Sequence, residues 1–319
     1  MIAIVLKKGK EKAVLQRHPW VFSGAIDAVK GKPADGDVVR LTDAKGNFLA
    51  YGFYNSQSRV AMRLLEWDEH TEINESWYSA RIQQAINSRG HLLARGDTDT
   101  CRLIFSEADY LPGLIVDKYA DYLSVQVLTT GMQRMMPVIT GELQRLLNPK
   151  GVFDKSDPAA RAHEGMDPSH GVLAGEAPPG LIQVKENGII YGINIAEGQK
   201  SGFYCDQRDN RRILAGHVAG KTVLDCFCYT GGFSLNALRQ GAAAVTSVDS
   251  SALAIETLGQ NISLNHFDAG RQASIQSDVN KQLRAFRDEG RQFDVIVLDP
   301  PKYAPSRSSL NRAARAYKD

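Results

Sequence analysis

Short apolar runs separated by turn residues occupy the first part of the chain. Their length and composition are typical of β-strands, and glycine- and aspartate-containing turns lie between them. The expected strands are Ala3–Leu6, Val38–Thr42, Phe48–Tyr54 and Val60–Leu65. Residues 1–68 are therefore predicted to form a small, mostly β domain.

Residues 69–180 mix helical and strand patterns. After the polar stretch Glu66–Asn74, apolar residues at helical spacing predict a helix over Glu75–Leu93. Two strand-like runs, Gly113–Val116 and Tyr122–Leu128, flank Asp117–Asp121 and predict a hairpin. This α+β middle domain is expected to continue with a helix over Met132–Leu147, a strand over Gly151–Asp154 and a loop or linker, rich in proline, glycine and alanine, over residues 156–180.

From residue 181 onward, strand and helix patterns alternate. Such alternation is typical of an α/β domain with a parallel, doubly wound sheet covered by helices. Ligand chemistry in these folds gathers at the carboxyl ends of the strands. The expected strands are Gly188–Ile195, Thr222–Asp225, Ala244–Val248, Ala273–Gln276 and Asp294–Leu298, with helices over Ala252–Asn265 and Ser309–Lys318.

Composition adds an asymmetry of charge. The chain has 319 residues, of which 43% are hydrophobic, and a formal net charge of +2. Residues 1–68 carry 11 lysines and arginines against 7 acids, a net charge of +4 that leaves −2 for the rest. This excess suggests a module that meets a polyanion such as nucleic acid, although a solvated lysine face would give the same charge.

Several classes of protein are excluded by pattern. No apolar run approaches the roughly 18 residues of a membrane helix, and the first residues lack a secretory signal, so we expect no membrane partner and a cytoplasmic location. The cysteines, Cys101, Cys205, Cys226 and Cys228, are too few for a disulfide framework and form no Cys-x-x-Cys pair. We expect most of them to be buried free thiols, and we expect no metal site.

Acidic residues end the predicted parallel strands. Asp225 precedes a turn with adjacent glycines, which lets a ligand approach the backbone closely, although neither a Gly-x-Gly-x-x-Gly nor a Walker pattern is present. Asp249 can accept both ribose hydroxyls of an adenosine or cap the following helix. Asp278 can accept the adenine amine or serve as a simple turn carboxylate.

The fourth of these strands is followed by Asp299-Pro300-Pro301-Lys302. Consecutive prolines after a strand expected to be buried fix a rigid loop without backbone donors, which would hold Asp299 in the crevice. Taken together, the acid-ended strands and this loop predict a site for S-adenosylmethionine.

The same motifs resemble those of a known family. The loop Asp225-Cys-Phe-Cys-Tyr-Thr-Gly-Gly-Phe, the strand end Ser247-Val-Asp249, the loop Asp299-Pro-Pro-Lys302 and the segment Gly198–Arg211 are similar to the class I ribosomal RNA large subunit methyltransferase I family. These are cytosine-5 enzymes with an N-terminal PUA domain. The opening Arg17-His-Pro-Trp-Val-Phe-Ser-Gly24 and Leu111-Pro-Gly-Leu-Ile-Val-Asp117 also match, so the resemblance covers the whole chain.

The resemblance implies a function and a domain order. The function would be S-adenosylmethionine-dependent methylation of a cytosine at carbon 5 in 23S ribosomal RNA. The domains would be a PUA-like RNA-binding domain over residues 1–68, the middle domain over residues 69–180 and a methyltransferase domain over residues 181–319, incomplete at its C-terminus.

The resemblance further implies a cofactor pocket. Asp249 would hold the ribose hydroxyls, Asp278 the adenine amine, and Asp299 with the Phe227–Gly231 loop the methionine end, while Lys200–Arg211 would lie over the cofactor. The expected catalytic residues are Asp299 and Lys302. The expected cofactor contacts are Phe203, Asp206, Arg208, Asp225, Phe227, Tyr229, Thr230, Gly231, Asp249, Asp278 and Asp299.

In the first domain, the resemblance turns the positive charge into an RNA surface. Lys7, Lys8, Arg17 and His18 would address phosphates. Trp20 or Phe22 could stack on an unpaired base, but their alternating positions favour a place in the core of the β domain.

Cytosine-5 methylation requires a thiolate that adds to carbon 6 of the ring. The family supplies this cysteine from a Ser-Cys-Ser type loop after a later strand, and no such loop occurs up to Asp319. The chain thus resembles an N-terminal piece of a longer protein, and we expect it to be inactive alone. Cys205, Cys226 and Cys228 are poor substitutes because they lie in or over the cofactor loop.

Alternatives stay open. One is an RNA methyltransferase acting on another base, although amino methyltransferases often carry an aromatic residue directly after Asn/Asp-Pro-Pro, where this chain has Lys302 and then Tyr303. Others are an RNA-binding module with an inactive methyltransferase half, a small-molecule methyltransferase and a Rossmann-type oxidoreductase. A homodimer is also left open.

Overall fold

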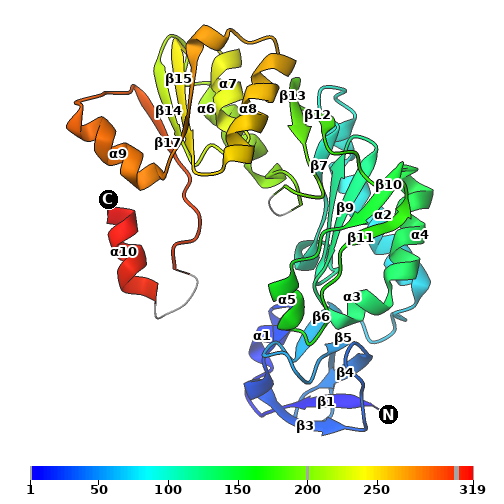
Figure 1. Cartoon of the computed structure of the whole chain (residues 1–319). Helices are drawn as coiled ribbons and strands as arrows, with labels where there is room; N and C mark the ends of the chain where they lie inside the picture. The colour runs from blue at the N-terminus through cyan, green and yellow to red at the C-terminus, as the bar shows by residue number, and fades with distance from the viewer. Residues whose placement is uncertain (1, 199–200, 305–308, 319) are drawn as a thin grey trace. The chain divides into compact units, whose positions relative to one another are not determined.

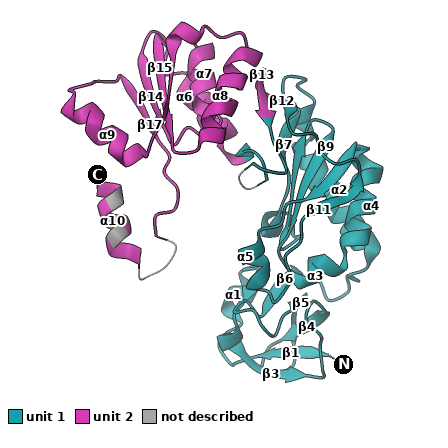
Figure 2. Cartoon of the chain, viewed as in Figure 1, with its two compact units in different colours: residues 1–184, 193–205 teal, residues 185–192, 206–319 magenta. Residues whose placement is uncertain are grey.

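The chain divides into two compact units (Figure 2). The computed structural model describes residues 2–198, 201–304 and 309–318. Unit 1 comprises residues 1–184 and 193–205, and unit 2 comprises residues 185–192 and 206–319. The finer division into three domains, with boundaries near residues 68 and 180, stays a prediction.

Unit 1 begins with a six-stranded sheet in the order β2-β6-β5-β4-β1-β3 (Figure 1). Strand β1 runs parallel to β4, and the other neighbours are antiparallel. Its core contains Ile4, Leu6, Leu41 and Met62. The elements are β1 (Ala3–Leu6), α1 (Lys12–Leu15), β2 (Trp20–Val21), η1 (Ser23–Ala25), β3 (Ile26–Lys30), β4 (Val38–Thr42), β5 (Phe48–Tyr54) and β6 (Met62–Glu66). The predicted β composition of this region is confirmed, whereas β2 and β3 were missed.

The predicted burial of Trp20 and Phe22 is wrong. Their side chains are 38% and 50% exposed, whereas Val21 between them is 3% exposed. Strand β2 lies at an edge of the sheet and pairs only through Trp20 and Val21, opposite Arg63 and Met62 of β6. Because side chains alternate across a strand, the inward position belongs to Val21 and the aromatic residues face outward.

A five-stranded mixed sheet follows, in the order β11-β10-β9-β8-β7. Its strands are β7 (Thr100–Phe105), β8 (Leu114–Tyr119), β9 (Tyr122–Val127), β10 (Gly151–Asp154) and β11 (Gly171–Gly175). Strands β8 and β9 form the predicted hairpin, with a left-handed residue, Ala120, in its turn. Helices α2 (Glu75–Leu93) and α4 (Met136–Leu147) pack on this sheet through residues such as Ile82, Ile139 and Leu143.

Two predicted elements of this region differ from the structure. The helix expected over Met132–Leu147 is broken at Met135 into α3 (Thr130–Arg134) and α4, because Pro137 lacks an amide hydrogen and is tolerated only in the first turn of a helix. Residues 156–180 are not a structureless linker. They contain α5 (Pro158–Ala162) and β11, which pairs with β10 so closely that a Cβ on Gly175 would lie 2.2 Å from the Lys150 carbonyl oxygen.

A two-stranded sheet lies where the sequence passes from unit 1 to unit 2. It consists of β12 (Ile182–Glu186) and β13 (Ile189–Ile193), and η3 (Cys205–Gln207) follows. The strand expected over Gly188–Ile195 therefore exists, but it pairs with β12 and is not a member of the parallel sheet.

Unit 2 contains the predicted doubly wound sheet. Its four strands are all parallel and run in the order β16-β15-β14-β17, with α7 and α8 on one face and α9 on the other (Figure 1). The strands are β14 (Thr222–Cys226), β15 (Ala244–Asp249), β16 (Gln272–Gln276) and β17 (Val295–Leu298). The helices are α6 (Arg208–Ala215), α7 (Gly232–Arg239), α8 (Ala252–Leu264), η4 (Ala269–Arg271), α9 (Val279–Asp288) and α10 (Leu310–Lys318).

Strand β17 is not buried as expected. Ile296 and Leu298 are 56% and 60% exposed. Within the described part of the chain, β17 pairs with β14 on one side only, so these side chains lack the neighbours that cover a central strand. The same described part contains no helix long and apolar enough to cross a bilayer.

A buried ion pair joins α6 to the end of β12. Arg211 donates to both carboxylate oxygens of Glu186, at 2.8 and 2.7 Å, and the two side chains are 3% and 1% exposed. A charge at such depth is tolerated only with a partner, so the pair fixes how α6 meets this strand.

Replacing Arg211 by methionine should therefore leave Glu186 buried without a partner. We expect Arg211→Met to lower the free energy of unfolding by about 3–5 kcal/mol, measured by urea denaturation. Arg287→Met, which breaks the exposed pair with Asp288, should change it by less than about 1 kcal/mol. Equal effects of the two substitutions would contradict this assignment.

Candidate functional site

The loops after β14 and β17 meet where the strand order of unit 2 reverses. Strands β14, β15 and β16 succeed one another in one direction, and β17 then pairs on the opposite side of β14. Phe227 follows β14 and Tyr303 follows β17, and their ring centroids lie 6.3 Å apart. Ligands of open α/β sheets bind at this switch point, beyond the carboxyl ends of the strands.

The loop after β14 has a strained backbone. Phe227, Tyr229 and Gly231 have φ values of 59°, 49° and 87°, in the left-handed region that non-glycine residues rarely adopt. Three contacts hold this shape: the Cys228 amide donates to the Val248 carbonyl at 3.1 Å, the Tyr229 amide to Asp249 Oδ2 at 2.9 Å, and Asn261 Nδ2 to the Thr230 carbonyl at 3.0 Å.

Gly231 is the position of this loop with the least room. A Cβ there would lie 2.2 Å from Leu258 Cδ1 and 2.8 Å from Leu235 Cδ1. The glycine lets the loop approach α8 and start α7 at Gly232, so its absent side chain is a packing requirement as well as a conformational one.

Asp249 has both carboxylate oxygens held by backbone amides. Oδ2 accepts from Tyr229 and Oδ1 accepts from the amide of Ser251, each at 2.9 Å. Ser251, not Asp249, caps α8. Because a carboxylate oxygen has two lone pairs, each oxygen of this half-buried group can accept one further hydrogen bond.

Asp225 lies in β14, next to the start of this loop, and is buried. Its Oδ2 accepts from the amide and hydroxyl of Ser234, at 3.0 and 2.5 Å, and Ser234 Oγ lies 2.6 Å from Ser247 Oγ. Oδ1 is buried and has no hydrogen-bond partner among the described residues. Burial, reinforced by the charges of Asp249 and Asp299 and opposed by the Ser234 hydrogen bonds, raises the pKa of Asp225 to about 7.

The other strand-end residues lie at the surface. Asp278 caps α9 by accepting from the Lys281 amide at 2.8 Å, which is the turn role foreseen as the alternative to adenine binding. Asp299 and Lys302 are exposed. Tyr303 also contacts Tyr317 of α10, with ring centroids 4.9 Å apart.

The segment expected over the cofactor spans both units. Gln199 and Lys200 lie outside the described residues. Phe203 belongs to unit 1, where it is buried. Asp206 and Arg208 belong to unit 2, where Asp206 is exposed and Arg208 lies 3.2 Å from Asp209 Oδ2.

A buried polar network anchors this segment within unit 1, and the sequence analysis missed it. Asp117 accepts from Arg102 at 2.8 and 3.0 Å and from the Ser201 hydroxyl, and it is fully buried. The Tyr119 hydroxyl lies 3.0 Å from Ser201 Oγ and accepts from the Phe203 amide at 3.2 Å. The contacts of Ser201 and Phe203 with Asp117 and Tyr119 join residues more than 80 positions apart in sequence, and no local pattern could have indicated them.

The cysteines are buried free thiols, as predicted. Burial, with the nearby charge of Asp225, raises the pKa of Cys226 to about 12 and that of Cys228 further still. At neutral pH these thiols are protonated, and a protonated thiol is a poor nucleophile.

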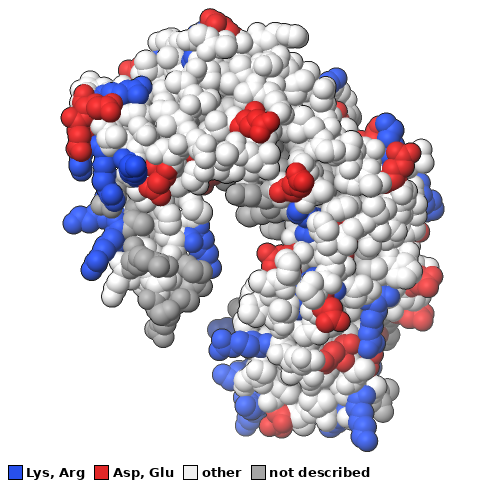
Figure 3. Space-filling model, viewed as in Figure 1, with Lys and Arg blue, Asp and Glu red and all other residues white. Residues whose placement is uncertain are grey.

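The predicted phosphate contacts are exposed residues of unit 1. Lys7, Lys8, Arg17 and His18 all face solvent. Lys7 Nζ donates to the Gly24 carbonyl at 2.9 Å, and the Arg17 guanidinium lies 5.1 Å from the Trp67 ring centroid. Figure 3 shows lysine and arginine side chains around α1 and the six-stranded sheet.

Comparison with known proteins places this geometry among methyltransferases. A PUA-like domain model matches residues 4–67, and an S-adenosylmethionine-dependent methyltransferase model matches residues 162–317. The ribosomal RNA large subunit methyltransferase I of Shigella flexneri is 41% identical over 318 residues, which are 100% of this chain and 80% of that protein.

Solved structures share the fold. An S-adenosylmethionine-dependent methyltransferase from Streptococcus mutans superposes with a TM-score of 0.82 at 24% identity, over 99% of this chain and 82% of that one. A methyltransferase complexed with SAH superposes with a TM-score of 0.83 at 24% identity, over 96% of this chain and 78% of that one. These superpositions confirm the α/β fold, and the methyltransferase model together with the 41% identical relative confirms the S-adenosylmethionine-dependent class.

The packing of Gly231 can be tested by adding one methyl group. Gly231→Ala adds a clash with Leu258 to the cost of a left-handed alanine, so it should weaken S-adenosylhomocysteine binding at least about tenfold in calorimetric titration. Gly220→Ala is the matched control, since Gly220 has a φ of 71° but no atom within 4 Å of its Cβ position. It should lose about 1–2 kcal/mol of stability and bind normally. Similar binding by both variants would disprove the assignment.

The raised pKa of Asp225 predicts a pH-dependent stability. Its folded-state pKa of about 7 exceeds the unfolded value near 4, so stability present at low pH is lost as the pH rises between these values. In urea denaturation, the free energy of unfolding of the wild-type protein should fall by up to about 4 kcal/mol relative to that of Asp225→Asn between about pH 4 and 7. Above pH 7 the difference between the two proteins should stay constant. A difference that stays constant between about pH 4 and 7 as well would show that Asp225 does not titrate there.

Proposed function

Because the chain belongs to the ribosomal RNA large subunit methyltransferase I family, we propose that it transfers a methyl group from S-adenosylmethionine to carbon 5 of a cytosine in 23S ribosomal RNA. The observation that carries the proposal is the 41% identity to the Shigella flexneri protein over 318 residues. The proposed substrate also implies action in the cytoplasm, where ribosomes are assembled.

The cofactor fits the site built from the strand ends of unit 2. We assign the ribose hydroxyls to Asp249, whose oxygens each keep one acceptor site, and the methionine end to Asp299 and the loop Phe227–Gly231. Asp278 is proposed for the adenine amine, with Asp225 supporting the loop from below. Asp206 and Arg208, which belong to the same unit as the strand ends, are proposed contacts from the preceding segment. When bound, S-adenosylmethionine supplies a methyl group on a sulfonium centre that a nucleophile can attack.

The choice of carbon 5 rests on the family resemblance. That carbon becomes nucleophilic only when a thiolate adds to carbon 6, and the buried, protonated Cys226 and Cys228 are not suited to this step. We therefore assign the nucleophile to none of the cysteines of this sequence. Asp299 and Lys302 are the proposed catalytic residues here, because they follow β17 at the switch point and are exposed to an entering base.

The RNA-binding part of the proposal rests on charge. The first 68 residues carry 11 basic against 7 acidic residues, and the proposed phosphate contacts Lys7, Lys8, Arg17 and His18 all face solvent. Neutralising phosphates with lysine and arginine supplies much of the affinity for RNA.

One observation favours a second candidate, methylation of another base. Tyr303 lies two residues beyond the proline pair, at the switch point beside Phe227, and an aromatic residue there can stack on a base whose amino group is methylated without a thiolate. This candidate needs no cysteine.

Methyl transfer separates these candidates. The protein expressed from its complete reading frame is incubated with methyl-labelled S-adenosylmethionine and 23S ribosomal RNA, and the nucleosides are analysed by mass spectrometry. We expect label as 5-methylcytidine. Label on a purine or on a cytosine amino group would support the second candidate, and label only on small molecules would exclude both.

The role of Asp249 is tested by cofactor affinity. Asp249→Asn keeps the size of the side chain but loses its charge and one acceptor, so the dissociation constant for S-adenosylmethionine should rise about tenfold or more. Asp268→Asn is the control, because Asp268 is an exposed carboxylate that accepts a backbone hydrogen bond in the same way, at 2.8 Å from the Gly270 amide. Unchanged affinity in Asp249→Asn would remove the residue from the site.

A further inference from the structure

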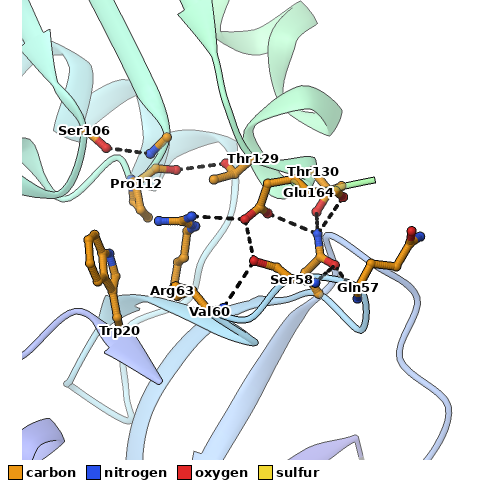
Figure 4. Close-up of polar contacts among 12 residues, drawn as sticks. Trp20, Gln57, Ser58, Val60, Arg63, Ser106, Pro112, Thr129, Thr130 and Glu164 are labelled. Carbon is orange, nitrogen blue, oxygen red and sulfur yellow. Dashed lines mark hydrogen bonds and ion pairs between the residues drawn. The ribbon is translucent and has the colours of Figure 1, made fainter. Parts of the chain in front are cut away.

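Unit 1 contains a cavity of about 570 Å³ that the cofactor site does not use. Small ligands bind in cavities of roughly 300–1,000 Å³, so its size is that of a binding site. Its wall is formed by residues of the first 68 positions, such as Trp20, Ser58 and Arg63, and by residues of the middle region, such as Thr129 and Glu164 (Figure 4).

Trp20 provides this cavity with a fixed aromatic surface. Its indole Nε1 donates to Glu107 Oε1 at 2.7 Å, and the Arg63 guanidinium lies 5.7 Å from its ring centroid. Phe22 meets the indole edge-on, with centroids 6.4 Å apart. A tryptophan that is 38% exposed yet held on several sides exposes apolar surface without the entropy cost of ordering it on binding.

The charges in the wall are paired with one another. Arg63 donates to Glu107 and to Glu164, each at 3.0 Å. Glu164 also accepts from Ser58 at 2.8 Å, as Figure 4 shows, and from Asn55 at 3.1 Å. Arg63 balances one of the two negative charges, so an anionic ligand needs the further cation that Arg59 supplies.

One donor in this wall has no partner. Arg63 Nε is buried and makes no hydrogen bond to any described residue, although both terminal nitrogens of the guanidinium are bonded. A buried donor without an acceptor costs free energy.

The rim of the cavity is basic. Arg59 and His163 line it and are exposed, and Arg17 and His18 lie close in sequence to Trp20, with the His18 ring 6.1 Å from the indole centroid. A flat exposed ring beside cationic side chains is the arrangement by which proteins bind unpaired nucleotides, the base stacking on the ring and the phosphates meeting the cations.

We propose that this cavity binds one unpaired nucleotide of an RNA strand, with its base stacked on Trp20 and its backbone phosphate at Arg59 and His163. The inference rests on the proposed function for the identity of the polymer, and it adds a site for a nucleotide other than the one methylated.

The experiment measures binding of a fluorescein-labelled, unstructured oligoribonucleotide of about eight nucleotides to the whole chain by fluorescence anisotropy. Trp20→Ala should weaken binding at least about tenfold, the factor expected from one lost stacking contact. Trp20→Phe should stay within about threefold of the wild-type protein, because it keeps a ring without the indole nitrogen. An unchanged melting temperature would show that both variants are folded.

Phe105→Ala is the matched control. Phe105 is 49% exposed beneath the Arg102 guanidinium, 5.1 Å from its ring centroid, but it does not line the cavity. It should bind the oligoribonucleotide as the wild-type protein does. A duplex of the same sequence should bind more weakly than the single strand and should not distinguish Trp20→Ala from the wild-type protein, because its bases are already stacked.

Two outcomes would overturn the inference: equal affinity of Trp20→Ala and the wild-type protein for the single strand, or an equal loss in Phe105→Ala. Neither outcome bears on methyl transfer, which is measured separately with 23S ribosomal RNA. Binding through Trp20 without methyl transfer would leave the inference standing and defeat the proposed function instead.

Discussion

The shape of the loop after β14 depends on three hydrogen bonds, those from the Cys228 amide, the Tyr229 amide and Asn261 described above. Together they hold Phe227, Tyr229 and Gly231 in left-handed conformations that a free chain would avoid. The strand order then brings the loop after β17 to the same edge. A strained loop, an oriented carboxylate and a switch point thus coincide, which is the geometry that a nucleoside cofactor requires.

The buried carboxylates of the chain differ in whether an arginine pairs with them. Asp117, Glu164 and Glu186 are each buried and each paired with an arginine: Arg102, Arg63 and Arg211 respectively. Asp225 is equally buried, but the hydrogen bonds described for it come from Ser234, and its pKa is raised to about 7. A paired carboxylate stabilises a junction between elements, whereas a buried carboxylate with a raised pKa is typical of a functional site. Among these four carboxylates, the contrast sets apart Asp225, which lies at the proposed cofactor edge of unit 2.

Local sequence patterns were sufficient to predict the helices and strands whose own residues have a clear periodicity or composition. The bounds of α2, β4, β5 and β10 agree with those predicted from periodicity and composition. Elements that depend on distant partners were missed or misjudged. Strand β11 is stabilised by its pairing with β10, and β13 pairs with β12 and not with the parallel sheet. Weak local preference in such segments is overridden by long-range hydrogen bonding.

The sequence by itself determined which residue types stand at the strand ends of unit 2 and predicted a cofactor site there, because acids at strand ends, adjacent glycines and a proline pair have local meanings in any doubly wound sheet. Tertiary structure alone decided which side chains are exposed and which are buried in hydrogen-bonded networks. Edge position turned Trp20 outward, where alternation in a small β domain suggested a core residue. A hydrogen bond that joins residues more than 80 positions apart ties Ser201 to the buried Asp117. Burial and long-range pairing depend on the whole fold, and no window of sequence contains them.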